Sequence, residues 1–155
     1  MEPPVQITPT KLGDYLEVLT KAVFESGISW AVIENKWKGF QEAFVGFDAD
    51  TVANFTPDDV DRLAQDTRIV RNRRKIEATI WNAQTMTALD HEFGGFKKYL
   101  GSQADYDSLV KDMKKRFKFV GDFGSYYFLY VVQEPVPEYH EFRAKLLESG
   151  KKKAS

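Results

Sequence analysis

The sequence contains no cysteine, only two histidines and no long hydrophobic run. Without cysteine the chain can form no disulfide bond and no zinc site built on thiolates, and two histidines alone do not complete a tetrahedral site. We therefore expect no metal and no cofactor. No apolar stretch approaches the length of a membrane span and nothing resembles a signal peptide, which predicts a cytoplasmic protein with no membrane partner.

An excess of charge of either sign is also missing. The chain has 22 lysines and arginines against 23 aspartates and glutamates, a net charge of −1, so the protein as a whole does not attract nucleic acid. Such a role would need a local basic patch, at residues 68–75, 111–118 or 151–153. With 155 residues, 43% of them apolar, we expect one globular domain over residues 10–150, with residues 1–9 and 151–155 as flexible termini.

Two helix patterns and a short hairpin occupy residues 55–81. Thr56 suits a helix N-cap and Pro57 the first helical position, so the first helix is expected to start there. Helical spacing of apolar residues stops within two turns and resumes at Asn72, which predicts a longer second helix to about His91.

The hairpin and the start of the second helix carry the densest positive charge of the sequence. The basic residues are Arg68, Arg71, Arg73, Arg74 and Lys75. Free backbone N–H groups at a helix N-terminus already favour an anion, so we predict that this cluster binds the phosphate backbone of DNA. A solvated arginine-rich turn without a ligand is the alternative.

Helical periodicity and turn residues predict further helices along the rest of the chain. They are expected at about residues 10–26, 29–44, 49–54, 96–100, 105–116 and 138–150. Residues 126–132 favour a strand by propensity, but no second run could pair with them, and a lone strand leaves its backbone groups unsatisfied. We therefore predict a helix there, and an all-α bundle of roughly seven to nine helices.

The central hairpin resembles the helix-hairpin-helix segment of the bacterial type-one 3-methyladenine DNA glycosylases. The matching residues are Asp58, Asp59, Val60, Leu63, Asp66, Ile69, Val70, Arg71, Asn72, Arg73, Lys75, Ile76, Glu77 and Ala78. Further matches are Gly27-Ile28-Ser29-Trp30, Phe47-Asp48, Glu92-Phe93-Gly94 and residues 115–121, so that the resemblance covers about residues 10–128. It implies the all-α bundle of the helix-hairpin-helix DNA glycosylases. Arg68 stands where that family usually has a glycine.

The resemblance also implies a role for Trp30, because the matching tryptophan of the family lies against the flipped base. A large aromatic face replaces the stacking that a flipped purine loses, and it attracts a cationic methylated purine. The alternative is that Trp30 is a core residue beside Val32 and Ile33.

The sequence departs from the family in the expected base pocket. The family's pocket glutamate corresponds to Ala22, which can neither accept a proton nor hydrogen-bond a base. Glu25, three residues on and near the same helix face, is the candidate to replace it as a catalytic residue, or else a surface glutamate without a role. The family's N-terminal tyrosine segment and its zinc site are missing.

Three functions follow as hypotheses. The first is a DNA glycosylase that excises alkylated purines from double-stranded DNA in base excision repair. The second is a catalytically inactive DNA-binding or lesion-sensing module that kept the hairpin. The third is an all-α protein with a packing role and an incidental basic turn.

Overall fold

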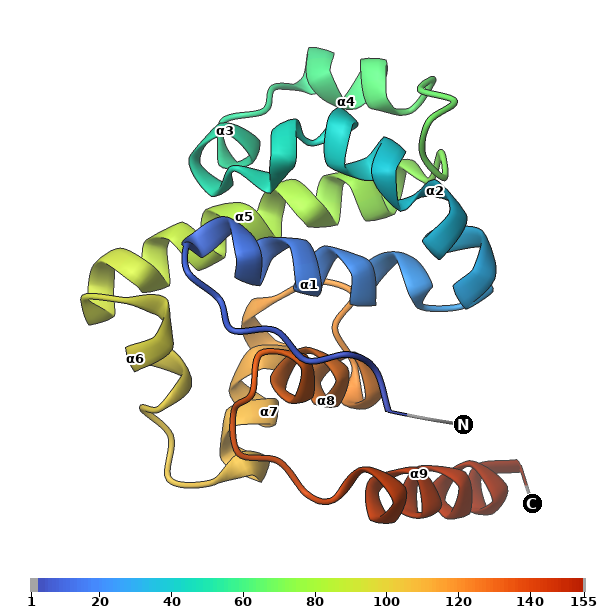
Figure 1. The fold of residues 1–155 in the computed structure, drawn as a ribbon, viewed down its shortest axis with the longest axis vertical. Helices are drawn as coiled ribbons and strands as arrows, with labels where there is room; N and C mark the ends of the chain where they lie inside the picture. Colours follow the sequence, from blue (N-terminus) through green and yellow to red (C-terminus); the bar gives the residue numbers. More distant parts are fainter. Residues whose placement is uncertain (1–2, 155) are drawn as a thin grey trace.

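The protein is a bundle of helices, and no strand occurs in the part of the chain that its structure describes (Figure 1). This structure, a computed structural model, describes the backbone of residues 3–154 and the side chains of residues 3–148. The elements are α1 (Leu12–Glu25), α2 (Trp30–Ala43), the 3-10 turn η1 (Val45–Phe47), α3 (Ala49–Ala53), α4 (Pro57–Leu63), α5 (Arg73–Phe93), α6 (Phe96–Leu100), α7 (Tyr106–Arg116), α8 (Asp122–Val131) and α9 (Tyr139–Ala154). The predicted all-α fold is confirmed.

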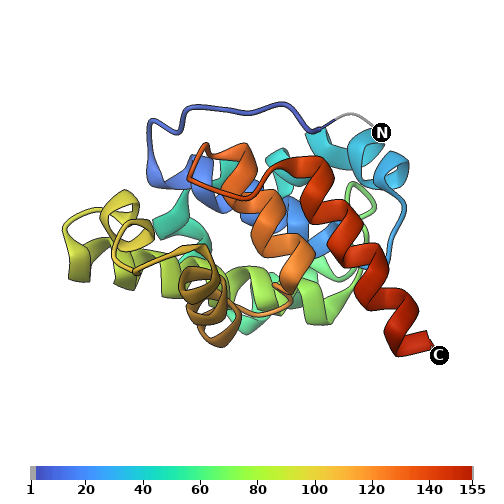
Figure 2. The ribbon, with the colours of Figure 1, turned by 90° about the horizontal axis from the view of Figure 1, so that it is seen from below.

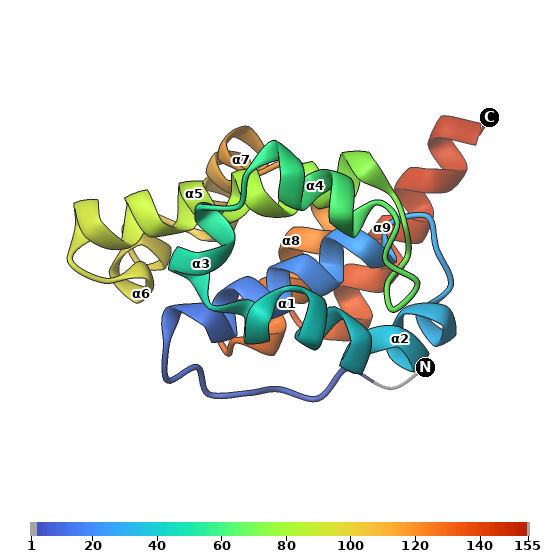
Figure 3. The ribbon, with the colours of Figure 1, turned by 90° about the horizontal axis from the view of Figure 1, so that it is seen from above.

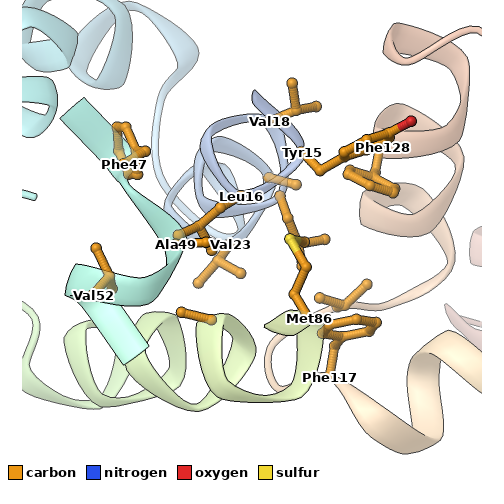
Figure 4. Close-up of a cluster of buried hydrophobic side chains, with 14 of the residues drawn as sticks. Tyr15, Leu16, Val18, Val23, Phe47, Ala49, Val52, Met86, Phe117 and Phe128 are labelled. Carbon is orange, nitrogen blue, oxygen red and sulfur yellow. The ribbon is translucent and has the colours of Figure 1, made fainter. Parts of the chain in front are cut away.

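Helix α1 is the centre of the bundle. It packs against α5 on one side and α8 on the other, and α2 also contacts it, while α3 and α4 pack on α5 (Figure 1). Leu16 and Val23 of α1 are fully buried on the side of α1 that faces Ala49, whereas Tyr15 of the same helix lies beside Phe128 of α8, with 6.2 Å between the ring centres (Figure 4). Burial of this apolar stripe, rather than helix propensity, stabilises helices of this length.

Helix α8 confirms the prediction of a helix where propensity favours a strand. Its middle is buried from Ser125 to Leu129, and Val132 closes the helix. A segment buried on most sides has no neighbouring strand to hydrogen-bond with, whereas a helix satisfies its own backbone groups.

Local capping chemistry sets several of the helix ends. Thr56 accepts from the backbone N–H of Asp59, whose carboxylate in turn accepts from the N–H of Thr56, so α4 starts at Pro57 as predicted. Helix α1 begins two residues later than expected, at Leu12, with Lys11 at the cap position.

Both chain ends contact or continue the bundle within the described residues, and the flexibility expected of residues 1–9 and 151–155 stays a prediction. Ile7 donates its backbone N–H to the carbonyl of Val131 at 2.8 Å, and Gln133 donates to the carbonyl of Ile7, so residues 3–9 follow the end of α8 (Figure 2). At the other end α9 continues to Ala154. Residues 1, 2 and 155 lie outside the described residues. No helix in the described part of the chain is long and apolar enough to cross a bilayer.

Candidate functional site

A cleft of about 460 Å³ opens between the C-terminal end of α1 and the N-terminal end of α8. Gly27, with φ of +76°, turns the chain away from α1 and leaves the end of that helix open. The lining residues are Ala22, Glu25, Ser26 and Gly27 at the end of α1, Phe119, Gly121, Asp122, Phe123 and Gly124 around the start of α8, and Leu146 of α9.

Glu25 is the buried acid of this cleft. Its side chain is 8% exposed, and neither carboxyl oxygen has a hydrogen-bond partner among the described residues. Loss of hydration raises the pKa of Glu25 from its ordinary 4.5 to about 8; the charge of Lys21 opposes the rise, and the charge of Glu34 adds to it. The alternative of a surface glutamate is therefore wrong. A carboxyl group with this pKa is mainly protonated at neutral pH.

Asp122 is the second carboxyl group of the cleft and differs from Glu25 in its surroundings. Its side chain is 61% exposed and lies 2.7 Å from the ammonium of Lys114. Among the residues whose side chains the structure describes, no lysine or arginine lines the cleft. The cleft is therefore acidic, with one solvated carboxylate and one buried carboxyl group.

Trp30 lies beside the cleft and not in its lining. It is the first residue of α2, its side chain is 37% exposed, and its indole meets the ring of Tyr127 edge-on at 5.4 Å. The alternative of a core tryptophan is thus wrong. Phe123 lines both the cleft and a narrow crevice that Trp30 and Tyr127 also line, so the indole adjoins the cleft through this phenylalanine.

Tyr127 is a site residue to which the sequence had given no role of its own. It is 6% exposed, and burial raises the pKa of its hydroxyl, with a further contribution from the neighbouring charge of Glu25. Phe119 and Phe123, both partly exposed in the cleft, had no assigned role either. Phe119 lies within residues 115–121, which match the family that the sequence resembles, and this match was the sequence signal that could have identified Phe119 as a site residue.

The basic hairpin between α4 and α5 lies against α2 (Figure 3). Gly39 of α2 makes this possible, because a Cβ atom there would fall 2.2 Å from the carbonyl oxygen of Arg68. Lys36, also on α2, donates to the carbonyl of Thr67 at 3.2 Å. Arg68 itself is held by Asp66, with a closest distance of 2.7 Å, and points toward Glu42.

The remaining arginines of the predicted phosphate-binding set are exposed. Arg71 has no ion-pair partner among the described residues, and Arg73 pairs with Asp61 at 2.8 Å on the surface. The guanidinium of Arg74 lies 6.0 Å from the centre of the Phe119 ring, at the edge of the cleft. The hairpin cluster and the cleft therefore adjoin each other.

Lys75 was predicted to bind phosphate, and the structure shows that this prediction is wrong. Its side chain is 4% exposed, and its ammonium donates to the carbonyl oxygens of Phe24, at 3.1 Å, and Ser26. Burial lowers its pKa. The last carbonyl groups of α1 have no hydrogen-bond donors within the helix, and the ammonium of Lys75 supplies one. The lysine is therefore held inside the protein and cannot reach a phosphate.

The described residues hold no group of three histidine, cysteine, aspartate or glutamate side chains placed to bind a metal. His91 is exposed in the last turn of α5, as expected, and His140 is exposed on α9. The residues present therefore do not fit the zinc site of the family that the sequence resembles.

Comparison of the sequence with known proteins finds relatives of one kind. A family model for methyladenine glycosylases matches residues 11–119. DNA-3-methyladenine glycosylase 1 of Escherichia coli is 31% identical over 126 residues, which cover 68% of this chain and 67% of the relative. DNA-3-methyladenine glycosylase of Haemophilus influenzae is 29% identical over 89 residues, covering 57% of this chain and 48% of the relative, so the chain spans about half the length of that protein.

A solved structure gives the same result for the fold. The crystal structure of a variant of 3-methyladenine DNA glycosylase I in complex with 3-methyladenine superposes with a TM-score of 0.71 and 26% sequence identity, over 83% of this chain and 80% of that chain. The family match includes the end of α1, the basic hairpin and the loop up to Phe119. The chain belongs to the methyladenine glycosylase family.

Proposed function

We propose that this protein is a DNA glycosylase that cleaves the N-glycosidic bond of alkylated, cationic purines such as 3-methyladenine in double-stranded DNA, as a step of base excision repair. The observation that carries the proposal is the unpartnered carboxyl group of Glu25 in a cleft beside the basic hairpin. The cleft volume lies within the range of about 300–1,000 Å³ that is usual for small-ligand sites.

The charge of the cleft favours a cationic base over a neutral one. Its lining contains Glu25 and Asp122 and, within residues 3–148, no basic side chain. A methylated purine that carries positive charge would stabilise the carboxylate form of Glu25 and lower its raised pKa, since an opposite charge at short range favours ionisation. The attraction between the cationic base and the carboxylate would thus offset the hydration free energy that both groups lose in the cleft.

The reaction needs little from the protein beyond this arrangement. The bond between C1′ of the deoxyribose and N9 of the purine breaks with its electron pair moving to N9, which neutralises the cationic base as it leaves. A water oxygen then bonds to C1′, and the carboxylate of Glu25 takes the proton that this water releases. Its negative charge also stabilises the positive charge that develops on the sugar.

The basic hairpin is proposed to hold the duplex. Arg71, Arg73 and Arg74 are exposed at the hairpin and the N-terminus of α5, where unpaired backbone N–H groups add to the attraction for phosphate. Arg68 is already paired with Asp66, so it contributes chiefly to the shape of the hairpin. Phosphate contacts position the protein on DNA and do not distinguish a damaged base.

Release of 3-methyladenine from a methylated duplex under single-turnover conditions tests the proposal. We expect release by the wild-type protein and a loss on the order of 100-fold in Glu25→Gln, the usual scale for a lost general base. Glu34→Gln is the matched control, because Glu34 is a nearby glutamate whose side chain is 49% exposed and paired with Lys21. Equal rates in the two variants would contradict the role of Glu25.

A non-catalytic lesion-binding module is the second candidate. The observation in its favour is that the raised pKa of Glu25 keeps its carboxyl group mainly protonated at neutral pH, and a protonated carboxyl group is a hydrogen-bond donor and not a base. Such a protein would bind alkylated duplex in preference to normal duplex and release no base. Measuring both properties on the same preparation separates the two candidates.

A further inference from the structure

The two carboxyl groups of the cleft lie at opposite kinds of helix end. Glu25 is the last residue of α1, and Asp122 is the first residue of α8. The C-terminal end of a helix carries partial negative charge and disfavours a carboxylate, whereas the N-terminal end carries partial positive charge and favours one. The two helices therefore hold one carboxyl group where a negative charge is disfavoured and another where it is favoured.

The side chains around the two groups act in the same direction. Glu25 is 8% exposed, and neither of its oxygens has a hydrogen-bond partner within the described residues, so no donor stabilises its charge. Asp122 is 61% exposed and lies 2.7 Å from the ammonium of Lys114. Two carboxyl groups in such unequal surroundings can divide the roles of general acid and general base.

A buried carboxyl group without a partner needs a hydrogen-bond acceptor from the ligand. The ring nitrogens N3 and N7 of a neutral purine are such acceptors. In 3-methyladenine the methyl group blocks N3, and the cationic base needs no proton in order to leave, because cleavage of the glycosidic bond neutralises it. The O–H group of Glu25 therefore provides something that a cationic base does not use.

We propose that the cleft also excises neutral purines from weakened base pairs, such as hypoxanthine opposite thymine, with Glu25 as the general acid and Asp122 as the general base. The inference rests on the proposed function, because it uses the same cleft and a nucleotide turned out of the duplex. A neutral purine is a poor leaving group until a ring nitrogen is protonated. A weakly paired nucleotide also leaves the stack at a lower cost than a normal adenine does, which gives selectivity.

The proposed reaction balances within the cleft. The O–H bond of the Glu25 carboxyl group breaks, and the proton bonds to N7 or N3 of the purine. The bond between C1′ and N9 then breaks with its electron pair moving into the purine ring, so that the base leaves neutral. A water oxygen bonds to C1′, and the proton that this water releases goes to the carboxylate of Asp122. Proton exchange with solvent returns both carboxyl groups to their starting forms.

The titratable groups that face Glu25 come from several helices. They are Lys21 of α1, Glu34 of α2, Lys75 of α5, and Asp122 and Tyr127 of α8, while α9 contributes the apolar Leu146. Lys21 and Glu34 pair with each other, and their charges act on Glu25 in opposite directions. Burial raises the pKa of the Tyr127 hydroxyl, which stays neutral, and lowers the pKa of the Lys75 ammonium. Lys75 is therefore the group that a pH experiment must separate from Glu25.

Release of hypoxanthine from duplex DNA with a hypoxanthine–thymine pair, under single-turnover conditions, tests the inference. We expect release by the wild-type protein and a loss on the order of 100-fold in both Glu25→Gln and Asp122→Asn. Asp107→Asn is the matched control and should keep the wild-type rate, because Asp107 is an exposed aspartate in the first turn of α7 that does not line the cleft. Thermal unfolding of each variant checks that the fold is intact.

The pH dependence of release gives a readout that a structural role would not change. The rate for hypoxanthine should fall about tenfold per pH unit above the pKa of Glu25, which is about 8, because the protonated form is needed. Release of 3-methyladenine should not fall in this range, since a cationic base favours the carboxylate. Lys75→Met should keep the fall for hypoxanthine. Loss of the fall in Lys75→Met, or equal profiles for the two bases, would overturn the acid role of Glu25.

Purine analogues test the proton transfer in the wild-type protein. 7-Deazahypoxanthine and 3-deazahypoxanthine each have a carbon in place of one ring nitrogen, and that carbon cannot take the proton. At least one of them should be released on the order of 100-fold more slowly than hypoxanthine, and full rates for both would overturn the inference. Release of 3-methyladenine without any release of hypoxanthine would overturn this inference alone. Release of hypoxanthine without 3-methyladenine would overturn the proposed preference for cationic purines and support the acid role.

Discussion

Replacing Glu25 by glutamine should change how the stability of the protein depends on pH. The unfolded chain releases the proton of this residue near its ordinary pKa of 4.5, whereas burial holds the proton in the folded protein up to a pKa of about 8. Between these two values the folded protein binds one more proton than the unfolded chain. The free energy of unfolding therefore falls as pH rises through this interval, and Glu25 adds no further slope below 4.5 or above 8.

The size of the effect follows from the two pKa values. Each pH unit in the interval removes up to about 1.4 kcal/mol, which sets an upper limit of about 5 kcal/mol for the whole interval. The carboxyl group lines a cleft that admits water, and solvation of its charged form reduces the cost. We expect a loss of about 3 kcal/mol between pH 5 and pH 8 in the wild-type protein relative to Glu25→Gln.

Urea denaturation at a series of pH values measures this difference. Glutamine has nearly the same shape as glutamate and no charge. The contributions of the other titrating groups, including both histidines, to the pH dependence of the free energy of unfolding are therefore the same in the two proteins and cancel in the difference. Glu77→Gln is the control for this experiment and should keep the wild-type slope, because Glu77 is an exposed glutamate of α5 whose charge does not contribute to the raised pKa of Glu25. Parallel pH curves for wild type and Glu25→Gln would show that Glu25 is not buried as a neutral acid, and the account of the cleft would fail.

Other substitutions test the remaining parts of the site. Arg71→Ala should weaken binding to damaged and undamaged duplex about equally and lower the salt slope by about 1, and a selective loss on damaged DNA would contradict a phosphate contact. Lys75→Met should cost about 2–3 kcal/mol of stability in chemical denaturation, because two carbonyls of α1 lose their donor, and it should leave the affinity of the folded protein for duplex within about twofold. Gly39→Ala should cost about 1–3 kcal/mol in thermal unfolding, since its Cβ meets the Arg68 carbonyl, and unchanged stability would mean that the hairpin is free to move away. Trp30→Ala should reduce the preference for a lesion by about 1–3 kcal/mol and spare general duplex binding; an unchanged preference with a large loss of stability would exclude a base contact.

Local chemistry made much of the fold predictable from the sequence. The threonine, proline and acidic residues at the start of α4 satisfy the first backbone N–H groups of that helix whatever surrounds it, so Thr56 identified the helix start correctly. The helix over residues 126–131 followed from a global argument, because no partner strand was available to satisfy its backbone.

The site depended on contacts that sequence spacing does not contain. Lys75 and Arg74 are adjacent in the chain, yet one is buried against the carbonyls at the end of α1 and the other is exposed beside Phe119. The direction of each side chain on α5 is set by where α1 and the 117–121 loop lie, and those positions result from packing of the whole bundle.

Glu25 shows most clearly which properties the sequence alone determines and which depend on the tertiary structure. The sequence alone placed a glutamate at the end of an apolar helix next to a glycine turn, and helical spacing brought it near the face of Ala22. Whether its carboxyl group meets water depends on α8, a helix about 100 residues further along the chain, and on the cleft that the two helices form. Its ionisation is therefore a property of the tertiary structure, because burial and the absence of a partner raise its pKa, and neither can be read from the order of the residues.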